Sequence, residues 1–183
     1  QGNKQRYTHV TYAMGFRVSR ELWEDELYGV IKAMPKELKF SARDIVENTA
    51  AGVFVNGFTD SAAYVGADGE PLFGDGTTTL HPLLGGGTFS NQLNPAMDLS
   101  ADSLELALNA IEATVNDRGL LIRLIAKTLI VPTRLRWVAQ ELLESKQKPF
   151  TSTNEMNPYE TLDMDWMVYH YLTDPDAWFI KCL

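Results

Sequence analysis

A glycine-rich segment in the first half of the chain limits where regular structure can form. More than half of the thirteen glycines lie in residues 59–97. Asp68-Gly69 and Asp75-Gly76 are turn signals, and the run Gly85-Gly86-Gly87 disfavours both helix and strand because glycine loses the most backbone freedom on folding. The sequence therefore predicts a long loop over residues 59–97, with helices and strands confined to the parts before and after it.

The part before this loop combines one strand pattern with helical patterns. Aromatic and β-branched residues recur at even positions of residues 7–18, which predicts a strand. Apolar residues at helical spacing follow over residues 19–58, with Ser19 as the N-cap candidate and Asn56-Gly57 as the stop. Because proline lacks the amide proton that a helix interior needs, we expect Pro35 to break or kink this stretch. The result would be one kinked helix or two consecutive helices.

The part after the loop alternates helices and strands. Ser100 is the N-cap candidate of one helix, and residues 127–131 form an apolar run that predicts a buried strand. Pro132-Thr133 ends this strand and begins another helix, while residues 164–171 and 177–180 predict two further strands. This mixed order predicts an α+β fold. The expected buried helix faces consist of Leu104, Ala107, Leu108, Ile111 and Val115, and of Leu135, Val138, Ala139, Leu142 and Leu143.

No sequence pattern identifies a catalytic, cofactor-binding or metal site. The three histidines have no His or Cys partner at a zinc-ligand spacing, and the single cysteine, Cys182, lacks a nucleophile signature. We therefore expect no enzymatic activity, no cofactor and no metal. Two alternatives stay open, a hydrolase that uses carboxylates from residues 155–176 and a non-catalytic adaptor module.

The charge balance argues against specific nucleic-acid recognition, and the hydropathy argues against a membrane protein. Lysines and arginines number 16 against 24 aspartates and glutamates, which gives a net charge of −8. Nucleic-acid binding needs clustered basic residues that release counterions from phosphates, whereas the basic residues here are scattered. No apolar run approaches the roughly 20 residues that a membrane-spanning helix needs.

Several segments occur in an order that is typical of one known family. They include the aromatic pattern of residues 7–19, the loop sequence Asp68-Gly69-Glu70-Pro71-Leu72-Phe73, the strand-Pro-helix segment 129–145, and residues 172–179 with the sequence Leu-Thr-Asp-Pro-Asp-Ala-Trp-Phe. From about residue 7 to residue 183 the chain resembles the major capsid (head) proteins of tailed bacteriophages and prophages, including Mu-like ones.

The resemblance implies the Hong Kong 97-type capsid fold, in which an extended arm leads into a long spine helix of a peripheral domain and then into an axial domain. By this resemblance, we expect four regions. Residues 1–18 would be part of the arm, 19–58 the spine helix region, 59–97 a surface or inter-subunit loop, and 98–183 part of the axial domain. The first arm strand and the last peripheral strands of the family have no counterpart. The chain thus resembles the middle portion of a longer protein, with an incomplete fold.

The resemblance also implies a function. It implies a structural subunit that assembles with its own copies into the hexamers and pentamers of a virion head around double-stranded DNA, in the cytoplasm of a bacterial host. Scaffold, portal or decoration proteins would be further partners. Exposed aromatic side chains gain stability when a neighbouring copy buries them. The expected subunit interface consists of Tyr7, Tyr12, Phe16, Trp23 and Tyr28.

Overall fold

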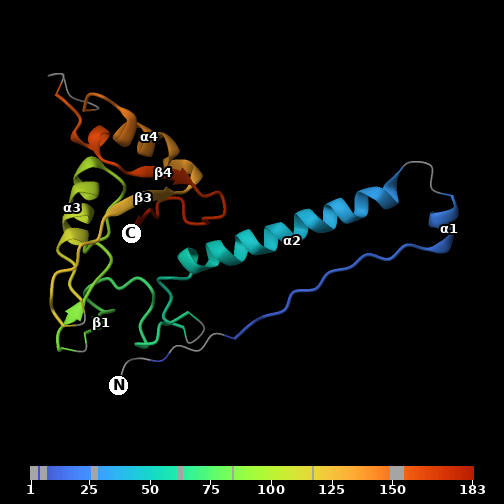
Figure 1. Ribbon diagram of the computed structural model, residues 1–183, viewed down its shortest axis with the longest axis horizontal. Helices are drawn as coiled ribbons and strands as arrows, with labels where there is room; N and C mark the ends of the chain where they lie inside the picture. The colour runs from blue at the N-terminus through green and yellow to red at the C-terminus, as the bar shows by residue number, and fades with distance from the viewer. Residues whose placement is uncertain are drawn as a thin grey trace.

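A long helix and an extended N-terminal segment project from a small body of helices and sheet (Figure 1). The computed structural model describes residue 4 and residues 8–25, 29–61, 64–83, 85–116, 118–148 and 155–183. In Figure 1 the extended segment leads outward to a short helix, α1, and the long helix, α2, leads back to the body. The mixed helices and strands agree with the predicted α+β class.

The N-terminal segment, residues 8–18, is extended but pairs with no strand among the described residues. The predicted strand is therefore wrong for residues 8–18, and Tyr7 lies outside the described residues. A strand needs a neighbour for its backbone hydrogen bonds, and sequence alternation alone does not supply one. Val18 is partly buried, whereas the other side chains of this segment are exposed.

Residues 19–58 form two consecutive helices, but the break between them is not at the predicted place. α1 spans Arg20–Glu24, and the Ser19 side chain accepts a hydrogen bond from the Leu22 backbone N–H at 3.2 Å, which confirms the expected N-cap. α2 spans Val30–Val55, and Asn56 is its C-cap, in agreement with the expected stop at Asn56-Gly57. Pro35 lies inside α2, so of its two expected effects, a break or a kink, the break is wrong.

α2 begins directly after Gly29, its N-cap, and not after Pro35. The φ of Gly29, 70°, is left-handed, a conformation that glycine adopts without steric cost, and the residue lies directly before the first helical turn. Pro35 follows within the second turn, so its missing N–H removes a hydrogen bond close to the helix start while the rest of the helix continues to Val55. The 26 residues of α2 extend over about 39 Å.

The glycine-rich segment forms a loop, as predicted, with one small hairpin inside it. β1, His81–Pro82, pairs antiparallel with β2, Thr88–Phe89. Gly86 and Gly87 lie in the connection and have φ values of 86° and 98°. Residues with a side chain rarely adopt these angles, which explains why glycines occupy these positions.

β3 is the middle strand of a three-stranded sheet with the order β4-β3-β5. β3 spans Ala126–Val131, β4 spans Asp165–Val168, and β5 spans Phe179–Cys182. β4 is parallel to β3 and β5 is antiparallel to it. All three predicted strands are confirmed, although β4 is shorter than the predicted 164–171 and β5 begins at Phe179 rather than at 177.

Two helices and two 3₁₀ turns complete the body. α3 spans Ala101–Glu112, and the expected N-cap is confirmed because Ser100 and Ser103 each accept a hydrogen bond from the other's backbone N–H. Pro132 follows β3, and the turn η1, Thr133–Leu135, leads directly into α4, Arg136–Glu144, as the sequence predicted. The second turn, η2, spans Pro158–Thr161.

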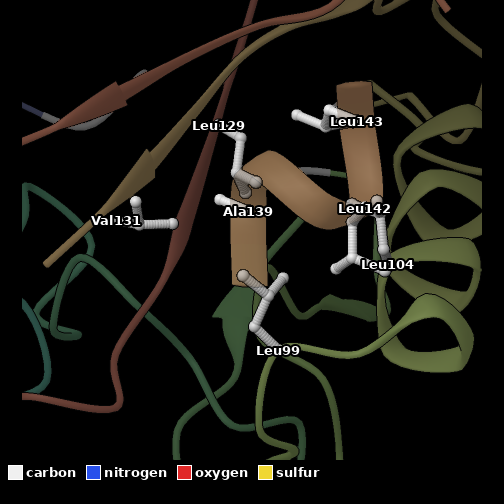
Figure 2. Packing of buried hydrophobic residues seen from close by; sticks show 7 residues of the cluster. All are labelled: Leu99, Leu104, Leu129, Val131, Ala139, Leu142 and Leu143. Carbon is white, nitrogen blue, oxygen red and sulfur yellow. The ribbon is translucent and has the colours of Figure 1, made fainter. Parts of the chain in front are cut away.

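The core lies between β3, α3 and α4 (Figure 2). Leu104, Ala139, Leu142 and Leu143 are buried on the predicted helix faces, whereas the other members of those faces are partly buried. In α2 the one described residue that is fully buried is Ala51, so this helix adds little to the core. The buried cluster consists of Leu99, Leu104, Leu129, Val131, Ala139, Leu142 and Leu143.

Asn157, like Ser103, is a buried polar residue of the body, with 1% of its surface exposed. Its side-chain Nδ2 donates to the carbonyl oxygens of Leu142 at 2.7 Å and Ser145 at 2.8 Å. Its Oδ1 accepts from the Tyr159 backbone N–H at 3.1 Å. Asn157 therefore satisfies a carbonyl of the last turn of α4 and begins η2 at the same time.

Candidate interaction surface

Large apolar side chains follow one face of the N-terminal segment and are open to solvent. Val10, Tyr12, Met14 and Phe16 occupy alternate positions, and each is between 44% and 69% exposed. Alternate side chains of an extended chain point to the same side. These four residues therefore form one apolar row, which the described part of the chain leaves uncovered.

Large apolar side chains are also exposed on the two projecting helices. Trp23 on α1 is 69% exposed and Phe40 on α2 is 72% exposed. Val30, Val46 and Val53 of α2 are exposed as well. The helical spacing of these valines predicted a helix correctly, but it carried no information about what covers the helix.

Three of the five side chains that we expected at a subunit interface lie on this surface. Tyr12 and Phe16 belong to the N-terminal segment and Trp23 to α1, and all three are exposed. Tyr7 and Tyr28 lie outside the described residues. Single exposed apolar residues are normal on a monomer, whereas a continuous set of them is typical of a site of association.

α2 is attached to the body through its C-terminal half. The Tyr169 hydroxyl, directly after β4, donates a hydrogen bond to the Glu47 carbonyl oxygen at 2.9 Å. Burial, together with the nearby Glu47 carboxylate, raises the pKa of Tyr169 above its ordinary value. Phe54 packs on Phe179 of β5 with ring centroids 5.1 Å apart. These contacts fix the direction in which the outer half of α2 projects.

A groove of about 490 Å³ lies where the end of α2 meets β5. Its apolar lining includes Phe58, which stacks on Phe73 with ring centroids 4.8 Å apart, and the partly exposed Met97. The Trp178 indole Nε1 donates to the Met97 carbonyl oxygen at 3.0 Å and holds that part of the lining in place. Sequence reasoning missed this groove, because its residues come from α2, β5 and the loop before α3.

Three aspartates give the groove an acidic rim. Asp98, Asp174 and Asp176 line it, together with the single basic residue Lys181. Asp176 lies 3.5 Å from Arg134, whereas no cation pairs with Asp98 or Asp174 among the described residues. The groove therefore combines apolar walls with a net negative charge.

The charge of the chain is divided unequally between the projection and the body. Residues 1–43 contain eight lysines and arginines and five aspartates and glutamates, a net charge of +3. Residues 44–183 contain eight basic and nineteen acidic residues, a net charge of −11. The division falls just before Glu47, where α2 contacts the body. The net charge of the whole chain is therefore the sum of a basic part, residues 1–43, and a strongly acidic part, residues 44–183.

Asp68 and His81 form a hydrogen-bonded pair that ties the glycine-rich loop together. His81 Nδ1 lies 2.6 Å from Asp68 Oδ2, and each side chain is mostly buried. Burial by itself raises the pKa of Asp68, but hydrogen bonds from His81 and from the Glu70 backbone N–H outweigh it and leave the pKa below its ordinary value. The His81 Nε2 atom is buried and has no hydrogen-bond partner among the described residues. The pair therefore has a structural role, because it connects two parts of the loop that lie thirteen residues apart in the sequence.

Asp75 organises a turn of the same loop. Its carboxylate accepts hydrogen bonds from the Thr78 hydroxyl at 2.6 Å and from the backbone N–H groups of Thr77, Thr78 and Thr79 at 2.8 to 2.9 Å. These hydrogen bonds, led by that from the Thr78 hydroxyl, hold the pKa of Asp75 far below its ordinary value. The sequence predicted turn chemistry at Asp75-Gly76, and this arrangement confirms it.

Acid is expected to destabilise this loop through Asp75. An unfolded chain protonates aspartate near pH 3.9, and the folded pKa lies lower, so Asp75 stabilises the fold above pH of about 4 and loses this effect as the pH falls toward the folded pKa. Asp75→Asn removes the titration, so its melting temperature should fall less than that of the wild type between about pH 6 and about pH 3. Circular dichroism melts across this range measure the difference. Asp60→Asn, at an exposed aspartate, is the control, and identical pH profiles for all three proteins would contradict the prediction.

Two carboxylates of residues 155–176, Asp163 and Glu155, lie beside lysines at the surface. Asp163 lies 2.7 Å from Lys127 Nζ, and Glu155 lies 3.2 Å from Lys148 Nζ. These two acids thus neutralise neighbouring lysines at the surface. Across the described ranges, no group of three or more His, Cys, Asp or Glu side chains could hold a metal ion. None of the helices in the described part of the chain has the length and hydropathy to cross a bilayer.

A family model described as phage capsid protein matches residues 2–181. No curated protein and no solved structure matches the chain.

Proposed function

We propose, since this chain belongs to the phage capsid protein family, that it is the structural subunit that self-assembles into a phage head around double-stranded DNA. Proteins of this family are structural components of the virion. The single observation that carries the proposal is the set of large apolar side chains on the N-terminal segment, α1 and α2 that the described part of the chain leaves exposed.

Association of copies would cover this surface. Burying apolar area contributes about 25 cal/mol per Å², so a few large side chains supply several kcal/mol at each contact. Contacts of this size, repeated by closed symmetry, are sufficient to hold a shell. We assign Tyr12, Phe16 and Trp23 to the subunit interface, and Tyr7 and Tyr28 on the sequence argument alone.

We further propose a Hong Kong 97-type arrangement, of the kind found in Mu-like heads. Residues 1–18 would belong to the extended arm, 19–58 to the spine helix region, 59–97 to a surface or inter-subunit loop, and 98–183 to part of the axial domain. The extended N-terminal segment and the projecting helix α2 support this reading, since both extend away from the body as an arm and a spine do.

The charge distribution supports enclosure of DNA without adhesion to it. The body carries a net charge of −11, and like charge keeps a protein surface from binding the phosphate backbone. Hexamers and pentamers of this subunit would form the shell after assembly in the host cytoplasm. Scaffold, portal or decoration proteins are the further partners of such a shell.

Sedimentation velocity and negative-stain microscopy of the full chain test this function. The proposal predicts rings, sheets or shells that grow with protein concentration. A protein that stays monomeric at every concentration would contradict it, and a discrete complex with an unrelated protein would favour an adaptor instead.

A further inference from the structure

We propose that the outer half of α2 in one copy docks along α3 of a second copy through helix faces of opposite charge. This inference rests on the proposed function, since it concerns a contact between copies, and it adds a pair of surfaces that the exposed apolar side chains do not identify. The docking surface is a row of basic side chains on α2, which we call the basic row. Its occupant is a row of acidic side chains on α3, the acidic row.

The basic row lies along the outer half of α2 and consists of Lys32, Lys36, Lys39 and Arg43. Their spacing of three or four residues places all four side chains within about 60° around the helix and over about 16 Å of its length. Glu37, the acid that lies among them in the sequence, is turned by about 100° from Lys36. All four basic side chains are exposed, and none forms an ion pair among the described residues.

The acidic row follows the exposed face of α3 and consists of Asp102, Glu105 and Glu112. Spacings of three and seven residues place these side chains within about 80° around the helix and over about 15 Å of its length. The described part of the chain gives none of them an ion-pair partner, and α3 itself contains no lysine or arginine. The acidic row therefore matches the basic row in length and is opposite in charge.

Each row repels itself in a single copy. Like charges that lie three or four residues apart on a helix destabilise it, and such neighbours follow one another along the whole basic row. Asp102 and Glu105 form a pair of the same kind in the acidic row. A surface of opposite charge removes this repulsion and also speeds the encounter of two copies at low salt. The two rows supply that surface to each other.

The two rows cannot meet within one copy. α2 contacts the body at Glu47 and Phe54, after the basic row, and the residues before Glu47 project outward. In Figure 1 α3 lies on the side of the body away from this projecting half. The acidic row that the basic row can reach therefore belongs to another copy.

Apolar side chains beside the two rows complete the contact. Ion pairs between exposed charges contribute little by themselves, so a stable contact also needs apolar burial. Phe40 is 72% exposed and lies one turn after Lys36, and Leu106 is 50% exposed and lies one turn after Asp102. Packing of Phe40 on Leu106 would bury apolar area and exclude water beside the ion pairs, which strengthens them.

Charge reversal on the full chain tests the inference. One protein carries Lys36→Glu and Lys39→Glu in the basic row, and a second carries Glu105→Lys and Glu112→Lys in the acidic row. Sedimentation velocity across a concentration series reports assembly at low and at high salt, and thermal melting of the dissociated proteins reports the fold.

The matched control for the basic row carries Arg118→Glu and Lys146→Glu. Both residues are exposed on the body, outside the basic row, and the change in net charge is the same. If a reversed protein melts early, Lys39→Gln or Glu105→Gln takes its place, because glutamine removes one charge at nearly unchanged helix propensity. Each of these milder variants should raise the concentration needed for assembly about threefold.

At low salt each reversed protein should need a roughly tenfold higher concentration to assemble than the wild type or the control, because like charges then face each other. A one-to-one mixture of the two reversed proteins should assemble almost as well as the wild type, since each meets the opposite charge in the other. At high salt the difference between the reversed proteins and the wild type should shrink.

A mixture that assembles no better than its two components, while the wild type still forms rings or shells, would overturn the pairing of the two rows and leave the proposed function intact. A wild type that never assembles would overturn both. Duplex DNA that the wild type retains and the basic-row variant releases, with assembly unchanged, would assign the basic row to nucleic acid and overturn the inference.

Discussion

Phe16→Asp and Trp23→Asp are expected to weaken assembly strongly while leaving the folded monomer almost unchanged. Both side chains are exposed in the monomer and lie outside the core, so a surface substitution should change the free energy of unfolding by only about 0.5 kcal/mol. At an interface the same side chains each contribute about 2 kcal/mol through apolar burial, and a buried carboxylate adds a desolvation cost. Because about 1.4 kcal/mol corresponds to a factor of ten, each variant should raise the concentration needed for assembly by more than roughly tenfold.

Two measurements on the same samples separate the two effects. Sedimentation velocity across a concentration series reports assembly, and thermal melting of the dissociated protein reports the fold. Trp137→Asp is a matched control, because Trp137 is 71% exposed but lies on α4 of the body, away from the N-terminal segment. If Phe16→Asp or Trp23→Asp lowers the melting temperature as much as it lowers assembly, the side chain supports the monomer and not an interface.

Asn157→Ala is expected to destabilise the body by about 3 kcal/mol. The substitution leaves the buried carbonyl oxygen of Leu142 without its donor, removes the second bond to Ser145, and leaves the Tyr159 N–H without its acceptor. A buried polar group that loses its partner retains its full desolvation cost. The truncation also leaves a small cavity between α4 and η2, which adds to the loss.

Chemical denaturation of the dissociated protein measures this change in the free energy of unfolding. Asn48→Ala is the matched control, because Asn48 is exposed on α2 and its side chain donates to Asp44 within the same helix. That control should shift the free energy by about 0.5 kcal/mol or less, since alanine is the better helix former. An Asn157→Ala protein as stable as the control would show that water or a rearranged backbone replaces the lost hydrogen bonds.

Features that depend on neighbouring residues could be predicted from the sequence. Ser19 and Ser100 begin helices because a hydroxyl at that position caps N–H groups two or three residues later. The order of strand, Pro132 and helix was predicted because proline ends the strand and suits a helix entrance. The turn at Asp75 follows from the same local chemistry, with all partners within four residues.

Features that depend on distant contacts could not be predicted. The alternation of residues 8–18 indicated a strand, yet the pairing that makes a strand has to come from another segment or another copy. The apolar stripe of α2 indicated a helix but not whether the body would cover it, and the structure leaves Val46 and Val53 exposed. Asn157 and the groove depend on residues brought together from separate elements, so no local pattern identifies them.

Hydrogen exchange of the N-terminal segment, measured by mass spectrometry in dissociated and in assembled protein, tests the central claim most directly. The claim is that other copies of the chain cover the open side chains of residues 8–24. We expect the amides of residues 8–18 to exchange at once in the dissociated protein and slowly after assembly, while those of β3 are slow in both states. Equally fast exchange of residues 8–18 in assembled particles, or slow exchange already in the monomer, would contradict the claim.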